Sequence, residues 1–332
     1  MRLIRGLHNL QSCTQAEGHP FPQGCVATIG NFDGVHRGHQ AIIEQVRQKA
    51  LALGVPSVAM VFEPQPQEFF AGADAPPRLM RFREKLTALW QYGIDTVVCL
   101  QFTPRLRKLS AKEFVERVLI DGLQVRHLVV GDDFRFGCDR GGDFLLLQQQ
   151  GAAAGFSVEN TETVLIAGER ISSTRVRKAL AENRLADAEE LLGRPYAIEG
   201  RVLHGRELGR KLDARTANIG LGHKNPALRG VYVVQVGRAG DGEGGGESCS
   251  FGAANIGYRP TVDGVDPLLE VHLLDFEAEL YGERLRATFL HQLRDEVRFD
   301  GVEALKKQIH QDFADARAWL ASHPPRPTNR DR

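Results

Sequence analysis

Short apolar runs alternate with amphipathic helical patterns along the first half of the chain. The apolar runs are rich in β-branched residues, and each is followed by a segment whose apolar positions lie three and four residues apart. Strands are predicted over 25–29, 57–62, 96–100 and 127–131, and helices from about residue 39 onward and over 82–92, 111–119 and 144–154. This alternation indicates βαβ units and a mostly parallel sheet.

The pattern changes after a helical stretch that ends near Pro195. Beyond it, β-type runs are separated by glycine-containing turns, which is typical of a small antiparallel barrel or sandwich. The runs lie at 196–203, 230–236, 249–257, 268–276 and 284–290, and a last helix is predicted over 302–320. The chain of 332 residues has room for two such domains.

Composition and charge narrow the class of protein. Hydrophobic residues make up 42% and charged residues 25% of the chain, as in a folded globular protein. Lys+Arg and Asp+Glu both number 42, so the chain lacks the basic excess with which proteins usually bind DNA or long RNA. Scattered cysteines, no signal-peptide core and no apolar run of about 20 residues predict a reduced, cytoplasmic protein without nucleic-acid or membrane partners. Nothing in the sequence indicates an oligomeric state.

A glycine-rich turn, GNFDGVHRGH, lies between the first predicted strand and its helix. In open parallel sheets, ligands bind at the carboxyl ends of strands, which is where this turn falls. Gly30, Gly34 and Gly38 allow a close backbone approach, and the helix N-terminus offers free amide donors to an anion. With the imidazoles of His36 and His39, these donors suit attack on a nucleotide α-phosphate. An ordinary turn with two surface histidines is the alternative.

The HxGH pattern of this turn resembles the signature of the nucleotidylyltransferase superfamily, whereas P-loop and GxGxxG patterns are absent from the turn. That superfamily places a second phosphate-contacting motif late in the same domain, where this chain reads ISSTRVR. Its hydroxyls could be helix caps. Its arginines, Arg175 and Arg177, could also bind a triphosphate.

Several motifs, taken in order, resemble the bacterial family of bifunctional riboflavin kinase and FAD synthetase. They are GNFDGVHRGH, FEPQPQEFF, VVGDDFRFG and ISSTRVR in the first half, and RTANIGL, ANIGYRPT and LEVHLLDF in the second. The resemblance covers nearly the whole chain apart from the extreme tail and the glycine-rich loop 237–248. It implies a Rossmann-like α/β nucleotidylyltransferase domain with a parallel sheet over 1–187. A small antiparallel β-barrel riboflavin kinase domain with a C-terminal helix would follow over 188–324, and then a flexible tail over 325–332.

By this resemblance, the first half adenylylates FMN with ATP, giving FAD and pyrophosphate, with His36 and His39 as catalytic residues. The implied nucleotide-binding residues are Gly30, Asn31, Asp33, Gly34, Gly38, Ser172, Ser173, Thr174 and Arg177. In VVGDDFRFG, residues Asp133, Phe134 and Phe136 could border the planar flavin, or could form a plain turn followed by core aromatics.

The second half would transfer the γ-phosphate of ATP to the ribityl 5′-hydroxyl of riboflavin. Strand alternation in LLEVHLLDF puts Glu270 and His272 on one face, and the resemblance implies that Glu270 is the catalytic base. Without the family resemblance, Glu270 would be interpreted as a solvent-facing strand carboxylate.

The resemblance also implies that magnesium enters as Mg-ATP. Thr216 and Asn218 offer neutral oxygen ligands to Mg²⁺. Gly205, Gly209 and Arg210 match the family's loop over the phosphates. The expected partners are therefore small molecules: riboflavin, FMN and ATP as substrates, with FMN and FAD as products.

One stretch departs from the family pattern. Members usually carry a glycine and a proline before the TAN sequence, where this chain has Asp213, Ala214 and Arg215. Asp213 adds negative charge near a triphosphate, and Arg215 removes the constraint of a proline. One alternative is therefore an FAD synthetase whose impaired kinase domain serves as a flavin-binding platform. Another is a non-catalytic flavin-responsive regulator, although a binding module has no need of both imidazoles.

Overall fold

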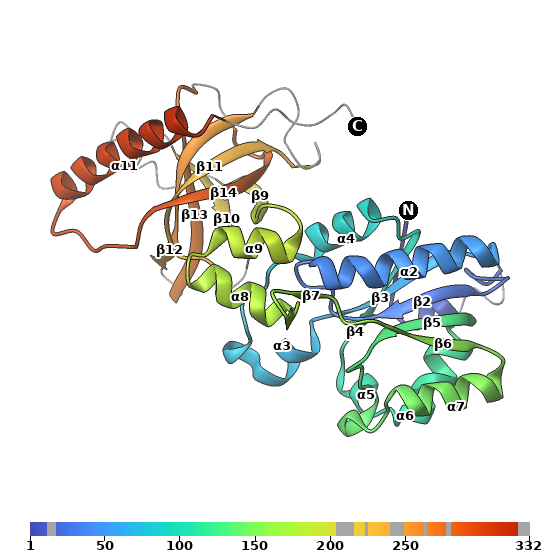
Figure 1. Cartoon of the computed structure of the whole chain (residues 1–332). Coiled ribbons are helices and arrows are strands. Elements are labelled where there is room, and N and C mark those ends of the chain that lie inside the picture. Colours follow the sequence, from blue (N-terminus) through green and yellow to red (C-terminus); the bar gives the residue numbers. More distant parts are fainter. Residues whose placement is uncertain are drawn as a thin grey trace. The chain divides into compact units, whose positions relative to one another are not determined.

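The computed structural model of the chain divides into two compact units (Figure 1). The first comprises Met1–Pro76 and Met80–Ser173, and the second comprises Pro77–Leu79 and Thr174–Arg332. The sequence-based boundary between 187 and 188 falls inside helix α9 (Leu185–Leu192). The structure describes residues 1–11, 18–203, 216–222, 225–239, 249–261, 264–276 and 280–324.

A parallel sheet of six strands forms the centre of the first unit, in the order β1-β4-β3-β2-β5-β6. The strands are β1 (Arg2–Arg5), β2 (Cys25–Ile29), β3 (Ser57–Glu63), β4 (Thr96–Gln101), β5 (Val125–Gly131) and β6 (Ser157–Thr161). The strand order reverses beside β2, which pairs with β3 on one side and β5 on the other. The carboxyl ends of β2 and β5 therefore flank the switch point where open α/β sheets bind ligands.

Helices cover both faces of this sheet. α2 (Arg37–Leu53) and α4 (Phe82–Gln91) bury apolar side chains on one face, and α6 (Ala111–Phe114), a π-helix (Val115–Ile120) and α7 (Phe144–Ala154) on the other. The remaining elements of the unit are short: α1 (His8–Gln11), α3 (Pro66–Ala71), α5 (Pro104–Arg107), 3₁₀ turns at Gly72–Asp74 and Cys138–Arg140, and the hairpin β7 (Leu165–Ile166) and β8 (Glu169–Arg170). The predicted parallel α/β architecture is confirmed.

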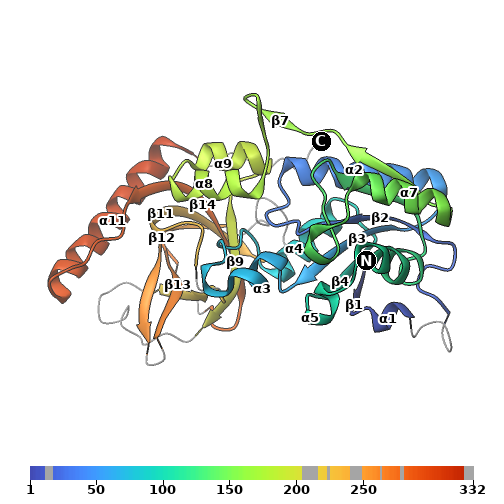
Figure 2. The same cartoon turned by 90° about the horizontal axis from the view of Figure 1, so that it is seen from below.

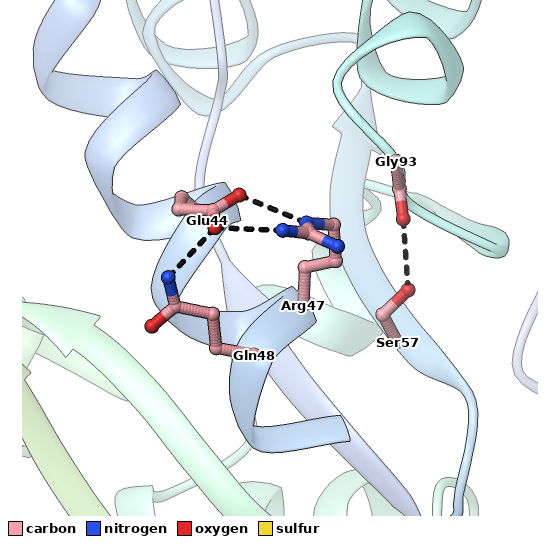
Figure 3. Close-up of polar contacts among 5 residues, drawn as sticks. All are labelled: Glu44, Arg47, Gln48, Ser57 and Gly93. Atoms are coloured by element: carbon pink, nitrogen blue, oxygen red, sulfur yellow. Dashed lines mark hydrogen bonds and ion pairs between the residues drawn. The ribbon is translucent and has the colours of Figure 1, made fainter. Parts of the chain in front are cut away.

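Two groups of polar contacts lie on α2 and at the start of β3 (Figure 3). Arg47 on α2 donates two hydrogen bonds of 2.8 Å to Glu44, which also accepts one from Gln48. The Arg47 side chain lies over Gly93, where a Cβ would come within 2.7 Å of its Cδ. The Ser57 hydroxyl, at the start of β3, donates to the Gly93 carbonyl. Among these described residues, the only contact between α2 and the loop before β4 is therefore the packing of the Arg47 side chain over Gly93.

A closed barrel of antiparallel strands forms the second unit, in the order β10-β13-β12-β11-β14-β9 (Figure 2). The strands are β9 (Ala197–Leu203), β10 (Thr216–Gly220), β11 (Gly230–Arg238), β12 (Ser250–Thr261), β13 (Gly264–Leu273) and β14 (Arg284–Arg294). Helix α8 (Ser173–Ala181) and α9 precede the barrel, and α11 (Val302–Ser322) follows it. The sequence pattern is compatible with a barrel or a sandwich, and the closed strand order selects the barrel.

Helix α11 is tied to the outside of the barrel by one buried ion pair and by stacked rings. Arg294 on β14 donates to both carboxylate oxygens of Asp312 at 2.7 Å, and Asp312 is only 5% exposed. The ring of His272 stacks on Phe313 with 3.8 Å between centroids, and Trp319 stacks on His291. The helix therefore packs against β11, β12 and β14, and its Phe313 reaches His272 on β13.

Within the part of the chain that the structure describes, no helix has both the length and the apolar character needed to cross a membrane.

Replacing Asp312 by alanine is expected to lower the free energy of unfolding of the second unit by about 3 kcal/mol, because it leaves a partly buried guanidinium without its carboxylate. Urea unfolding followed by Trp319 fluorescence in a Trp90→Phe background measures this. The matched control is Arg317→Ala, which breaks the exposed pair with Asp275 on the same helix and should cost less than about 1 kcal/mol. Equal losses in the two variants would contradict the assignment of Arg294–Asp312 as the main tie.

Candidate active sites

The HxGH turn leaves the end of β2 through a tight backbone path. Phe32 (φ 47°), Gly34 (φ 85°) and Val35 (φ 39°) all have positive φ angles. Positive φ is unfavourable for the two side-chain-bearing residues. Phe32 and Val35 are 1% and 0% exposed, and their burial against α2 and the sheet holds them in this conformation. The turn is therefore fixed by the hydrophobic core.

This path brings the two imidazoles of the motif into contact. The rings of His36 and His39 stack with 3.7 Å between centroids and 14° between planes. His36 is the N-cap of α2, and its Nδ1 accepts a hydrogen bond from the His39 amide at 3.3 Å. The Nδ1 atom of His39 is buried without a hydrogen-bond partner. A buried ring nitrogen of this kind suits a ligand at the helix N-terminus.

The electrostatic surroundings keep His39 uncharged. Burial is the largest cause that holds its pKa well below the ordinary value, and the charges of His36 and Lys85 lower the pKa further. Lys85, on α4, is 0% exposed. His39 is thus a neutral imidazole at physiological pH.

The second phosphate motif lies against the HxGH turn. The Ser173 hydroxyl donates to the Asp33 carbonyl at 2.9 Å, and the Asp33 carboxylate accepts from the Met80 amide at 3.2 Å. A Cβ at Gly38 would lie 3.2 Å from His36 Nδ1 and 3.7 Å from the Ile171 carbonyl. Glycine at this position therefore lets ISSTRVR approach the paired histidines.

The other residues predicted for the first site have fewer contacts with the paired histidines. Gly30, where a Cβ would lie 3.1 Å from the Phe32 ring, and the half-buried Asn31 start the turn. Ser172 is half-buried and Thr174 is exposed. Arg177 donates from Nε to the Pro77 carbonyl at 2.6 Å.

Some residues predicted for the kinase site lie outside the described residues. They are Gly205, Gly209, Arg210 and the segment 213–215, where the chain departs from the family pattern.

The loop after β5 combines a charged and an aromatic part. Arg170, on β8, pairs with Asp132 at 3.1 Å and with Asp133 at 2.8 Å. Phe134 and Phe136 stack with 5.6 Å between centroids. Phe136 is only 7% exposed and belongs to the core, whereas Phe134 is half-buried.

In the barrel, three polar residues lie directly opposite one another on adjacent strands. Glu270 on β13 pairs in register with Asn218 on β10 and with Asn255 on β12. We call Asn218, Glu270 and Asn255 the oxygen row. The amide oxygens of both asparagines are buried without hydrogen-bond partners. Thr216 lies two residues before Asn218 on β10, opposite His272.

Sequence reasoning alone misses Lys85, Gln65 and Asn255. Lys85 stands among the buried positions of α4, so helical periodicity is the available signal. Gln65 is 3% exposed and follows β3, and its Nε2 is buried without a hydrogen-bond partner. Asn255 lies within ANIGYRPT, which contributes to the family resemblance but to no predicted site.

The donors near Thr216 fit a hard cation better than a transition metal. No group of three or more His, Cys, Asp or Glu residues that could hold a metal is found in the described ranges. Asn218 is 9% exposed, and its partnerless buried Oδ1 is a neutral oxygen ligand. Mg²⁺ commonly takes few protein ligands and completes its shell with water and phosphate oxygens.

The fold and these sites define a nucleotide-binding α/β domain joined to a β-barrel domain. Comparison with family models agrees: the model described as FAD synthetase matches residues 19–175, and the model described as riboflavin kinase matches residues 192–320. A crystal structure of a macrolide-efflux protein from Streptococcus pneumoniae has the same fold, with a TM-score of 0.77, 28% identity, and coverage of 96% of this chain and 99% of that one.

Relatives that match the chain over its length carry both domains. A bifunctional riboflavin kinase/FMN adenylyltransferase of Pseudomonas fluorescens is 54% identical, over 97% of this chain and 98% of its own length. The protein of that name from Escherichia coli K12 is 48% identical, over 96% and 98%. The chain belongs to the bifunctional riboflavin kinase/FMN adenylyltransferase family. The bifunctional interpretation of the sequence is confirmed, and the alternative of a synthetase alone is not favoured.

Replacing Lys85 by methionine is expected to raise the pKa of His39, because a positive charge that opposes its protonation is removed. The pKa should stay below the ordinary value, since burial is the larger cause. An NMR titration of the histidine rings, with His39 identified through His39→Gln, measures the shift.

Lys49→Met is the matched control, because the pKa of His127 is lowered mainly by burial and further by the charge of Lys49. It should move the pKa of His127 and leave that of His39 in place. An unchanged His39 titration in Lys85→Met would contradict the electrostatic role of Lys85.

Proposed function

We propose that the first unit adenylylates FMN at the HxGH turn and that the barrel phosphorylates riboflavin at the oxygen row. The observation that carries the first assignment is the stacked His36–His39 pair at the switch point, in which His36 and the Nδ1 atom of His39 are buried; Ser173 contacts the same turn at Asp33. The proposal follows the family in its two substrates, riboflavin and FMN, and in its use of ATP. The predicted cytoplasmic location and the absence of nucleic-acid partners rest on the sequence alone.

In the adenylylation, a phosphate oxygen of FMN attacks the α-phosphorus of ATP, and the bond to the pyrophosphate oxygen breaks. Charge grows on the phosphoryl oxygens, so the site must supply hydrogen-bond donors. The imidazole of His36, the neutral imidazole of His39 and the free amides of α2 would supply them beside the reacting phosphorus. The binding residues would be Gly30, Asn31, Asp33, Gly34, Gly38, Ser172, Ser173, Thr174 and Arg177.

The loop after β5 would form the flavin side of this site. Phe134 offers a half-buried ring at the carboxyl end of β5, and the buried Phe136 stacks beneath it. Asp133 would be held in place by Arg170. Phe136 would therefore support the flavin contact from the core, while Phe134 touches the ring system.

In the kinase reaction, Glu270 would accept the proton of the ribityl 5′-hydroxyl. The resulting oxygen attacks the γ-phosphorus, the bond to the bridging oxygen of ADP breaks, and FMN is formed. Mg²⁺ would neutralise charge on the phosphates when bound. Thr216 and Asn218 would hold it, and Gly205, Gly209 and Arg210 would lie over the phosphates.

Two variants separate the activities. Glu270→Gln should lower riboflavin phosphorylation by about 10²–10⁴-fold, because it removes the general base. His39→Ala should lower FAD formation from FMN by about 10²–10³-fold, because it removes a charge-stabilising group. Each variant controls for the folding of the other site. The measurement is a chromatographic time course with ATP and magnesium, started from riboflavin in one reaction and from FMN in the other.

Wild-type protein should carry riboflavin through FMN to FAD. FAD formed from FMN but never from riboflavin would reverse the kinase assignment. Loss of both activities in one single variant would contradict the separation into two sites.

A further inference from the structure

The oxygen row presents hydrogen-bond acceptors to whatever binds there. The Asn218 and Asn255 amide oxygens are buried without partners, and the carboxylate of Glu270 lies between them. Directly opposed residues on antiparallel strands have Cβ atoms about 5 Å apart, so the three side chains share one short patch. A row of acceptors is satisfied by a ligand that brings donors or a cation.

Along the strand direction, the oxygen row has a neighbouring feature on each side. At one end, His272 stacks on Phe313 of α11. At the other, Gly257 on β12 has no side chain, and a Cβ there would overlap the carboxylate of Glu296. Glu296 adds another acceptor beside Asn255, since Gly257 and Asn255 lie two residues apart on the same strand face. The ligand on the Asn255 side must therefore be rich in donors and free of phosphate charge.

The order of the strands separates a metal side from a substrate side. β10 carries Thr216 and Asn218, β13 carries Glu270, and β12 carries Asn255. In phosphoryl transfer, the attacking oxygen and the leaving oxygen lie roughly in line on opposite sides of the phosphorus. With Mg-ATP held toward β10, the hydroxyl that gives its proton to Glu270 approaches from β12. This step rests on the proposed function of the barrel.

We propose that Asn255 binds a hydroxyl group of the ribityl chain of riboflavin through its amide oxygen and so positions the 5′-hydroxyl against Glu270. Asn255 is a substrate-binding residue of the kinase site, while Asn218 serves the metal and nucleotide. The ribityl chain supplies the neutral hydroxyl donors that this end of the face requires.

The test compares riboflavin with lumiflavin, which has the same ring system and a methyl group in place of the ribityl chain. In Asn255→Ala, the KM for riboflavin in the kinase reaction should rise about tenfold, as for the loss of one buried hydrogen bond. The Ki of lumiflavin as a competitive inhibitor should stay within about twofold, and the KM for Mg-ATP should not change. Equilibrium titration of both flavins in the presence of Mg-ADP gives the same comparison without turnover.

Two further variants make the outcome decisive. Asn255→Ser keeps a neutral oxygen acceptor without adding charge beside Glu270 and Glu296, and it should keep riboflavin affinity closer to wild type than Asn255→Ala. Asn218→Ala should instead shift the magnesium concentration needed for activity. FAD formation from FMN, measured in every variant, reports on the folding of the remainder of the chain.

Equal weakening of riboflavin and lumiflavin in Asn255→Ala would mean a structural role and would overturn the proposal. A shifted magnesium requirement with unchanged riboflavin affinity would place Asn255 on the metal side and would also overturn it. Wild-type values throughout would do the same. If wild-type protein itself fails to phosphorylate riboflavin, the proposed function fails, which is a different result.

Discussion

Two imidazoles stacked 3.7 Å apart at the N-terminus of α2 are the feature on which the proposed chemistry of the first unit depends. Two protonated rings at that separation would repel each other by about 4 kcal/mol even at an effective dielectric constant of about 20. Burial adds to this cost, and Lys85 brings a further positive charge. His39 is therefore held neutral. A neutral imidazole can donate a hydrogen bond to a phosphate oxygen without taking up a proton.

The surrounding fold serves to keep that pair in place. Phe32 and Val35 adopt positive φ angles that their own burial supports, Ser173 fixes the Asp33 carbonyl, and Gly38 leaves room for His36. Because the donors are fixed before a ligand arrives, little reorganisation is needed when charge develops in the transition state.

Most of the fold could be predicted from the sequence, because buried parallel strands are continuous apolar runs. β2, β3, β4 and β5 all have this form. The edge strands β1 and β6 are largely exposed and lack such a run, so no strand is predicted there. β10 is recognisable only as a motif, since its Thr216 and Asn218 interrupt the β-type pattern. The HxGH motif could be recognised in the sequence because its residues are contiguous. Asn255 and Lys85 could not be recognised as neighbours of the candidate sites, because only strand register and helix packing bring them there.

The side chains described at the two candidate sites differ in polarity, and under the proposed function this difference matches the flavin that each site takes. Both reactions also use ATP, whose phosphate charge Mg²⁺ would neutralise in the barrel. The HxGH turn presents donors: imidazoles, helix amides and, from ISSTRVR, hydroxyls and arginines. The oxygen row presents acceptors, so a neutral riboflavin with its hydroxyl groups fits there. Phosphorylation converts that ligand into one with about −1.5 to −2 charges. Once Mg-ADP has left, the new phosphate would face Glu270 and the amide oxygens, whereas the donor-rich HxGH turn would attract it. Under the proposed function, the side chains described at each site therefore favour riboflavin at the barrel and FMN at the HxGH turn, which is the order that FAD synthesis requires.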